Sequence, residues 1–479
     1  MKSLHTWLWL TASLGCSHAI STIVDLGYCK YQDTYLASGV SQFLGIRYAD
    51  TPVDDWRWRA PRNANSRSGI QHADHLPPIC VGLGQTTGLN ATEDCLFVNV
   101  FAPSNATIDS NLPVWVYIQG GGIILVNFNY RVGPLGFLAS EEVRADGPLN
   151  VGLLDQRKLL HWVQEYIHLV CIAPSRGTSV THHLTAYNGR NDDLFVGAIG
   201  ESLAWTRSLT VTQSEDHFES LAPRLNRSTV DRMTCLRSLD ASTVQTSGHA
   251  PLDVLALSTQ LLFQPQGEFL GIPLILSYDT SEGSLSAPNA STKKEVASFV
   301  QGWSPQLNGP QIQHLVNPYP PEEVIPGRAR YFPAASEIFA DGVFLCPTNW
   351  ITRSANFISQ CGLTVIMFLI ILRWLLPFLA PAKQRVSGQA PWGGGFLYHY
   401  TTYNATIVEG IQNYFISFVR SLDPSSLRSP SSPRWKRSNL GEKGRLKIQT
   451  NQTEMDKIPS DLLEKCETWY SYEESIAQE

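Results

Sequence analysis

The chain has 479 residues and a net charge of −6, and 43% of its residues are hydrophobic while only 16% are charged. This composition excludes an intrinsically disordered chain, and without a long basic run nucleic acid is not expected as a partner. The length exceeds the roughly 100–200 residues of an average domain, but large α/β sheets with long loops reach such sizes as one unit.

The first 19 residues have the pattern of a secretory signal peptide. Lys2 precedes an apolar centre, and the small residues Ser17 and Ala19 suit signal peptidase. This apolar run is too short for a membrane-spanning helix. We therefore expect cleavage near Ala19 and secretion of residues 20–479. Six N-x-S/T sequons are candidate glycosylation sites of an extracellular protein: Asn90, Asn105, Asn226, Asn289, Asn404 and Asn451.

Eight cysteines remain once Cys16 is removed with the signal peptide. An even number in an oxidising compartment predicts disulfide bonds, whose pairing the sequence alone does not decide. None of the eight has C-x-x-C or Cys/His spacing, so we expect no metal site. They are Cys29, Cys80, Cys95, Cys171, Cys235, Cys346, Cys361 and Cys466.

The first half of the chain alternates apolar strands with a helix. Residues 96–103 and 112–122 read as strands, and the second runs into three glycines; 123–133 is a further apolar strand. Residues 150–169 place apolar side chains close to the helical period. Strand, glycine loop, strand and helix in this order predict an α/β protein.

The second half is richer in helices and loops. Residues 206–330 are interrupted by 271–283, which reads as a strand ending in a turn, and 405–422 reads as an amphipathic helix followed by a Ser/Pro/Arg-rich linker. Between them lies an apolar segment, 361–385.

These stretches resemble the type-B carboxylesterases and lipases, in particular the secreted fungal branch of this family. The resemblance implies one α/β-hydrolase domain over residues 20–479, with a large, mostly parallel sheet flanked by helices. It also implies a disulfide between Cys80 and Cys95. The matching stretches are "GIRYADTPVDDWRWRAP", "EDCLFVNVFAP", "VWVYIQGGG", "NFNYRVGPLGFLAS", "NVGLLDQRKLLHWVQEYI", "SVTHHLTAY", "DTSEG" and "TYNATIVEGIQNYFISFVRSLDP".

Two parts of the family's catalytic machinery have matching residues. The motif Q-G-G-G matches the family's oxyanion hole, in which Gly121 and Gly122 would donate backbone N–H groups to the developing negative charge. The motif runs straight into the next strand, whereas relatives carry an intervening loop. "YDTSEG" matches the acid turn and assigns the histidine-orienting carboxylate to Glu282, with Asp279 nearby.

The nucleophile elbow departs from the family pattern, which is G-x-S-x-G after an apolar strand. The nearest match is Ser175, but Pro174 has a fixed φ and no N–H, and Arg176 is bulky where the turn needs a small residue. We also expect the sheet to be incomplete here, because the preceding strand is short. Ser202, in Gly-Glu-Ser-Leu-Ala, mimics the motif farther along the chain, where we expect only a strand end beside the active-site region.

The catalytic histidine has no matching residue. After Glu282 the chain offers only His314, which reads as a surface helix residue, and His399, which does not align with the family's histidine loop. The apolar segment stands in that place. Residues 362–382 would span about 31 Å as a helix, enough to cross a bilayer, but Arg373 in the middle argues against a membrane anchor. We expect a buried or aberrant insert instead.

Two hypotheses follow for the function. The first is a secreted carboxylic ester hydrolase, acting on small-molecule or lipid esters without metal or organic cofactor, that is catalytically impaired by abrupt replacements such as mis-joined exons would produce. The second is a non-catalytic binding protein, like adhesion molecules that share the fold but lack the triad. The sequence decides neither between these two nor the oligomeric state, and transcript sequencing would test the first.

Overall fold

The structure is a computed structural model that describes most of the chain. The predicted signal peptide and most of the apolar segment 361–385 lie outside the described residues. The described ranges are 22–88, 90–107, 110–118, 126–167, 170–172, 178–204, 210–221, 231–247, 269–279, 282–321, 325–354, 362–365, 405–438, 444–449 and 452–472.

One large sheet organises the molecule, with strand order β16-β15-β14-β13-β12-β11-β9-β10-β8-β4-β3. The seven central strands, from β10 through β9 and β11 to β15 in this order, are parallel to one another, and antiparallel strands complete both edges. The predicted mostly parallel sheet is therefore confirmed. Its strands are β3 (Thr34–Leu36), β4 (Val40–Arg47), β8 (Phe97–Pro103), β9 (Val114–Ile118), β10 (Val126–Phe128), β11 (Val170–Ile172), β12 (Gly197–Gly200), β13 (Leu274–Tyr278), β14 (Gly362–Val365), β15 (Gly444–Gln449) and β16 (Gln452–Lys457).

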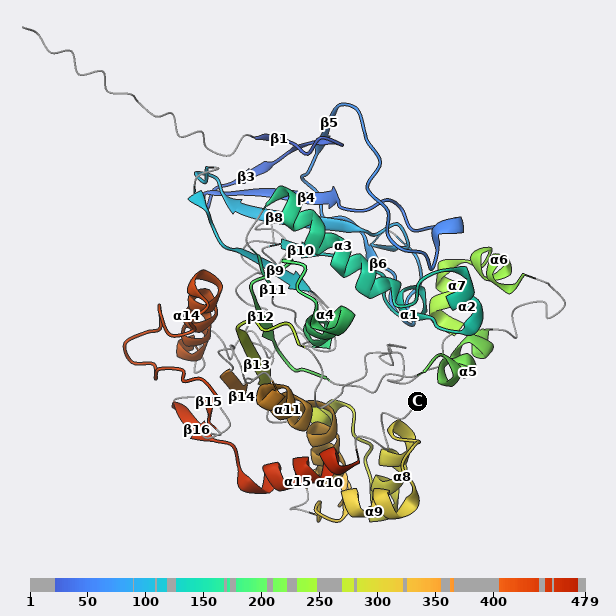
Figure 1. Ribbon diagram of the computed structural model, residues 1–479, viewed down its shortest axis with the longest axis vertical. Helices are drawn as coiled ribbons and strands as arrows, with labels where there is room; N and C mark the ends of the chain where they lie inside the picture. Colours follow the sequence, from blue (N-terminus) through green and yellow to red (C-terminus); the bar gives the residue numbers. More distant parts are fainter. Residues whose placement is uncertain are drawn as a thin grey trace, which may run out of the picture.

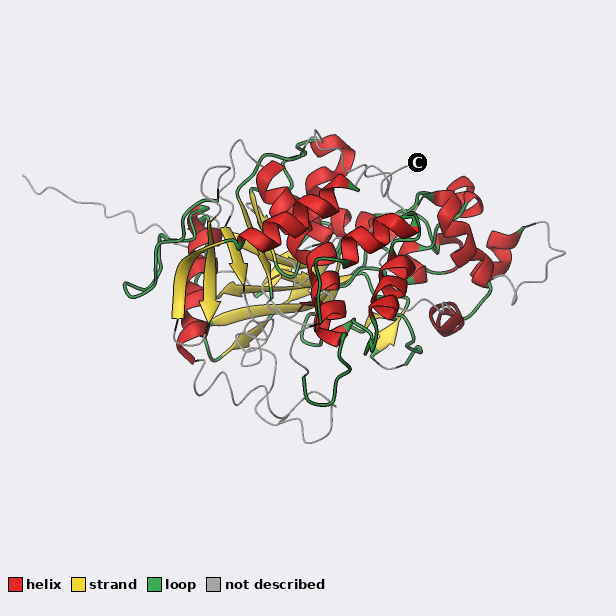
Figure 2. Ribbon diagram, turned by 90° about the horizontal axis from the view of Figure 1, so that it is seen from below, coloured by secondary structure: helices red, strands yellow, loops and turns green. Residues whose placement is uncertain are grey.

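Helices cover both faces of this sheet, because its central strands are apolar at successive positions. Ala198 and Leu276 pack in one core with residues of α3 (Val151–Tyr166) and α4 (Thr178–Gly189). Their sequence neighbours Ile199 and Ile275 point the other way, into a core with α14 (Ala405–Ser421). Figure 1 shows α3 and α4 on one side of the strands and α14 on the other, and Figure 2 shows the strands gathered into one layer.

The elbow strand is present, which corrects one expectation. β11 has only three residues, but it pairs in parallel with β9 on one side and with β12 on the other. The sheet is thus continuous across the position where the sequence suggested a gap. A short strand is sufficient because both neighbours supply its backbone hydrogen bonds.

The start of the apolar segment is a strand and not part of a helix. Gly362–Val365 form β14, which pairs with β13 and β15, so a single helix over 362–382 is wrong. No helix within the described ranges is both long and apolar enough to cross a membrane.

Two groups of helices extend the molecule beyond the sheet (Figure 1). One group packs around a core that includes Phe218, Leu236 and Val244. The other packs around Ile338, Leu315 and Trp469 and contains the acid turn η5 and the π-helical turn η6. The remaining helices are η1 (Asp54–Trp56), α1 (Pro134–Phe137), α2 (Glu141–Asp146), α5 (Val211–Leu221), α6 (Arg232–Arg237), α7 (Ala241–Ser247), η5 (Glu282–Leu285), α8 (Lys293–Trp303), α9 (Gly309–Val316), α10 (Phe332–Ala340), η6 (Asp341–Leu345), α11 (Cys346–Ser354) and α15 (Ser460–Ser471).

Small strands and a second disulfide complete the fold. β1 (Ile23–Asp25), β2 (Lys30–Gln32) and β5 (Ile70–His72) form a three-stranded sheet, and β6 (Ile79–Cys80) pairs with β7 (Ala91–Thr92). Cys346 and Cys466 form a disulfide that joins α11 to α15 across 120 residues of sequence. Sequence alone left this pairing open.

Asp341 is a carboxyl group buried inside the second helical core. It is 2% exposed, and its Oδ2 accepts a hydrogen bond from the Tyr319 hydroxyl at 2.9 Å. Burial raises the pKa of Asp341 to about 7, with a further contribution from the negative charge of Glu337. In the folded protein this carboxyl group therefore stays protonated at pH values below about 7, where a solvated aspartate would be ionised.

We predict that the contribution of Asp341 to the free energy of unfolding falls as the pH rises from about 4 to about 7, because the folded chain keeps a proton on Asp341 that the unfolded chain releases in this range. Asp341→Asn should remove this part of the pH dependence, since an amide does not titrate. Urea unfolding of both proteins across this range measures the difference. An identical pH dependence in both would contradict the prediction.

Candidate active site

The acid turn lies where the sequence predicts it. Glu282 lies four residues after the end of β13 and begins the short helix η5, and its Oε1 accepts a hydrogen bond from the backbone N–H of Asp279 at 2.8 Å. The Ser202 hydroxyl lies near the same carboxylate and lowers its pKa. The bond to Asp279 holds Glu282 at the carboxyl edge of the sheet, where active sites of open α/β sheets form.

Close packing against α10 fixes the position of this turn. A Cβ built on Gly283 would lie 1.8 Å from the Ser336 carbonyl oxygen and 3.1 Å from the Ala340 nitrogen. Only glycine permits this approach, because both contacted atoms belong to the helix backbone. The glycine of the "TSEG" motif is thus explained by packing.

Ser202 lies at the end of the strand next to β13. It comes two residues after β12, is partly buried, and has a φ of +47°. A left-handed conformation is uncommon for a residue other than glycine and costs energy that the surrounding structure must supply. The sequence predicted a strand end beside the active-site region here, and the proximity of Glu282 agrees with this.

The carboxyl groups around the acid turn are shifted toward their neutral forms. Burial raises the pKa of Glu282, although the N–H of Asp279 and the Ser202 hydroxyl partly oppose this. Burial and the nearby negative charge of Asp279 raise the pKa of Glu201 to about 8. Glu282 is therefore a stronger base than a solvated glutamate.

Other predicted site residues lie outside the described residues: Gly121 and Gly122 of the oxyanion motif, Ser175 and His399. The described flanks of two of these segments lie at the same edge of the sheet. β9 ends at Ile118, and α4 begins at Thr178, whose hydroxyl donates to the Ala204 carbonyl. The amino end of α4 is thus held beside the turn that carries Ser202.

His182 and His183, which follow the elbow region, are buried in the core, and His314 lies at the surface. Burial lowers the pKa of His182 to about 4 and that of His183 to about 3, so both are neutral near pH 7. A ring nitrogen of His183 hydrogen-bonds to Oε1 of Gln156 at 2.9 Å. His314 is exposed on α9, as the sequence suggested, with its Nδ1 2.5 Å from the Tyr472 hydroxyl.

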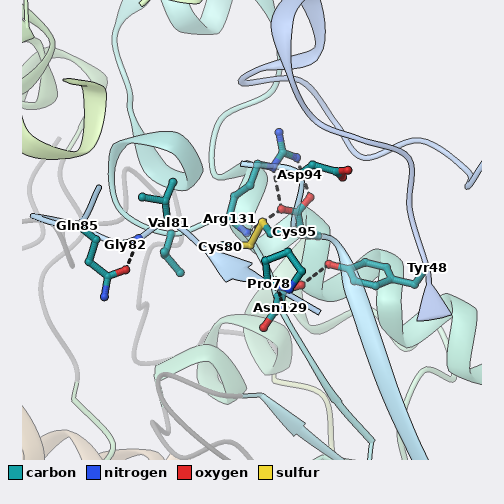
Figure 3. Close-up of a disulfide and its surroundings, with 12 residues drawn as sticks. Tyr48, Pro78, Cys80, Val81, Gly82, Gln85, Asp94, Cys95, Asn129 and Arg131 are labelled. Carbon is teal, nitrogen blue, oxygen red and sulfur yellow. Dashed lines mark hydrogen bonds and ion pairs between the residues drawn. A yellow bond between two sulfur atoms is a disulfide. The ribbon is translucent and has the colours of Figure 1, made fainter. Parts of the chain in front are cut away.

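The structure contains the disulfide that the family resemblance implies. Cys80, at the end of β6, is bonded to Cys95. Figure 3 shows the surroundings, in which Asn129 accepts a hydrogen bond from Tyr48 and donates one to the Pro78 carbonyl. These bonds fasten the disulfide segment to the residues that follow β10.

Three of the six candidate glycosylation sites lie within the described residues. Asn90, Asn105 and Asn289 are exposed, as a glycan acceptor must be, and the other three sequon asparagines lie outside the described residues. No cluster of three or more potential metal-ligating side chains was found within the described ranges.

Comparisons of the sequence and of the structure with known proteins both find esterases and lipases. A model of the family described as "Carboxylesterase family" matches residues 28–124 and 122–295. The crystal structure of Aspergillus niger EstA is similar with a TM-score of 0.83 and 35% identity, covering 95% of this chain and 99% of that chain. Secreted lipase 4 of Gibberella zeae is 26% identical over 88% of this chain and 86% of its own length. Lipase 1 of Geotrichum candidum is 26% identical over 81% and 85%.

Proposed function

Because this chain belongs to the carboxylesterase family and has the α/β-hydrolase fold, we propose that it is a secreted carboxylic ester hydrolase whose family triad is impaired. The observation that carries the proposal is the position of Glu282, held after β13 by the backbone N–H of Asp279. The name of the Gibberella zeae relative supports secretion. Small-molecule or lipid esters are the substrate class, without metal or organic cofactor.

The chemistry of the family is acyl transfer. A serine attacks the ester carbonyl, a histidine carries the proton, backbone N–H groups stabilise the oxyanion, and water releases the acid. In this chain Gly121 and Gly122 would hold the oxyanion and Glu282 would orient the histidine. Ser175 and His399 are the nearest residues to the nucleophile and base, and neither stands in a family motif.

Two observations support the impairment. The family match consists of two segments that meet at residues 122–124, where relatives carry a loop after the oxyanion motif. Pro174 and Arg176 flank Ser175 where a strained elbow needs small residues. A displaced nucleophile or base loses the proximity on which acyl transfer depends, because a misplacement of about 1 Å costs about 100-fold in rate.

A non-catalytic binding protein is the second candidate. The continuous pairing of β11 with both of its neighbours favours it, since the fold can persist without the triad. The two functions predict different behaviour of the same purified protein, so one set of measurements separates them.

We predict cooperative thermal unfolding together with hydrolysis of 4-nitrophenyl acetate at a rate about 10⁴–10⁶-fold below that of an intact serine hydrolase, as for triad knock-outs. Aspergillus niger EstA, assayed in parallel, is the reference. A rate equal to that of EstA would refute the impairment. Cooperative unfolding with no hydrolysis above the buffer rate would favour the binding protein instead.

A further inference from the structure

The chain contains three pairs of adjacent basic residues, Arg157–Lys158, Lys293–Lys294 and Lys436–Arg437. An endoprotease with two neighbouring acidic pockets recognises such a pair, because the pockets bind the two cationic side chains. A protease of this kind binds its substrate as an extended strand. The local backbone therefore decides which of the three pairs can be cut.

Two of the three pairs lie in helices. The pair at 157–158 is in the middle of α3, and the pair at 293–294 forms the first turn of α8. Thr292 caps α8, since its hydroxyl accepts a hydrogen bond from the backbone N–H of Glu295 at 3.2 Å. Cleavage at either pair would require the helix to open locally, which costs backbone hydrogen bonds and packing.

The third pair lies in an irregular segment of the surface. Residues 433–438 belong to neither a helix nor a strand, and Lys436 and Arg437 are both exposed. Arg434, which is also exposed, adds a third basic side chain to this segment. Exposed irregular segments are the preferred sites of proteolytic nicking. The backbone thus favours this pair over the two helical ones.

The residue before this pair is anchored in the core. Trp435 is 4% exposed, and its ring meets that of Tyr414 edge-on. The backbone N–H of Trp435 donates to the Ser425 hydroxyl at 3.0 Å. These contacts attach the segment to α14. The peptide bond after Arg437 lies two residues beyond the anchor, on its exposed side.

We propose that the protein is cleaved after Arg437 by a dibasic-specific endoprotease during secretion, and that the two resulting chains stay together. The inference rests on the secretion that belongs to the proposed function, and it is independent of ester hydrolysis. In the cleavage the peptide bond between Arg437 and Ser438 breaks. Water supplies a hydroxyl group to the Arg437 carbonyl carbon and a proton to the Ser438 nitrogen, so no other reactant is consumed.

The contacts of the fragment 438–479 would keep it in place after cleavage. It contains β15 and β16, and β15 pairs in parallel with β14 of the larger chain. The disulfide between Cys346 and Cys466 joins the two chains covalently. Trp469 stacks on Trp303 with the ring centroids 5.3 Å apart. The expected product is therefore a folded protein of two disulfide-linked chains.

The first test examines the full chain expressed with its signal peptide in a eukaryotic host that has a dibasic-specific protease. Gel electrophoresis of the medium should give one band without reduction and two chains after reduction, the smaller beginning at Ser438 by N-terminal sequencing. Secreted protein that remains one chain after reduction overturns the inference and leaves secretion standing. Protein that never leaves the cell overturns both.

The second test places the same dipeptide in a helix. The protein is made in a host without such a protease and treated with kexin, a serine endoprotease that cleaves after Lys-Arg. Lys294→Arg makes the pair at 293–294 identical to the pair at 436–437, but within α8. Kexin should cut this variant only after Arg437, and equal cutting at both pairs would refute the selection by the backbone. Arg437→Gln should abolish the cut before Ser438, and its persistence would overturn the inference.

Discussion

Replacing Asp155 by alanine should lower the free energy of unfolding by about 3–5 kcal/mol, the usual cost of breaking a buried ion pair from one side. Arg131 is 2% exposed and Asp155 is fully buried. Three N–H groups of Arg131 donate to this carboxylate: the backbone N–H at 3.1 Å, Nε at 2.8 Å and Nη2 at 2.7 Å. Without Asp155 the guanidinium remains buried and uncompensated.

An exposed ion pair provides the matched control. Glu141 and Arg144 form one on the surface of α2, with more than half of each side chain exposed. Arg144→Ala should change stability by less than about 0.5 kcal/mol, because such pairs contribute little. Urea unfolding monitored by circular dichroism measures both variants. Similar losses in the two would show that the buried pair is compensated by water or by relaxation.

Gly283→Ala should cost about 3 kcal/mol or more, at the upper end for overpacking. The added methyl group would meet the Ser336 carbonyl oxygen at 1.8 Å and its carbon at 2.7 Å, and neither atom can move without displacing α10. The turn that holds Glu282 must then shift away from the helix. The loss should appear in thermal or urea unfolding and, with it, in any ester hydrolysis that depends on Glu282.

The control for this substitution is Gly302→Ala in α8. A Cβ built on Gly302 meets no atom within 4 Å. Alanine should stabilise this helical position by up to about 1 kcal/mol, because it restricts the unfolded backbone. The two Gly→Ala variants are therefore expected to have opposite signs. A neutral Gly283→Ala would mean that the acid turn is not packed against α10 as closely as described.

The acid turn could be predicted from sequence because its signals are local. An apolar run reads as a strand, the residues after it read as a turn, and a parallel strand delivers its final residues to the edge where sites form. The helix at 151–166 was equally predictable from its apolar spacing. Both predictions, the turn and the helix, depend only on residues that are close together in the sequence.

The proximity of Ser202 and Glu282 could not be predicted in this way. It involves residues 80 positions apart, and it depends on the strand order, in which β12 lies between β11 and β13. The motif Gly-Glu-Ser-Leu-Ala was the available signal, but its position after the elbow helix made it read as a strand end. Residues 362–365 show the same limit, since an apolar run alone does not distinguish a buried strand from a helix.

The two disulfides differ in the time that passes between the synthesis of their first and second cysteines. Cys80 and Cys95 leave the ribosome within a few seconds of each other, being 15 residues apart, whereas Cys466 follows Cys346 by 120 residues, roughly 6–24 s at ordinary rates of synthesis. In the secreted protein that we propose, Cys346 enters the oxidising compartment before its partner Cys466 has been synthesised, whereas Cys80 and Cys95 have already had time to pair. The disulfide between α11 and α15 therefore forms after the one between Cys80 and Cys95.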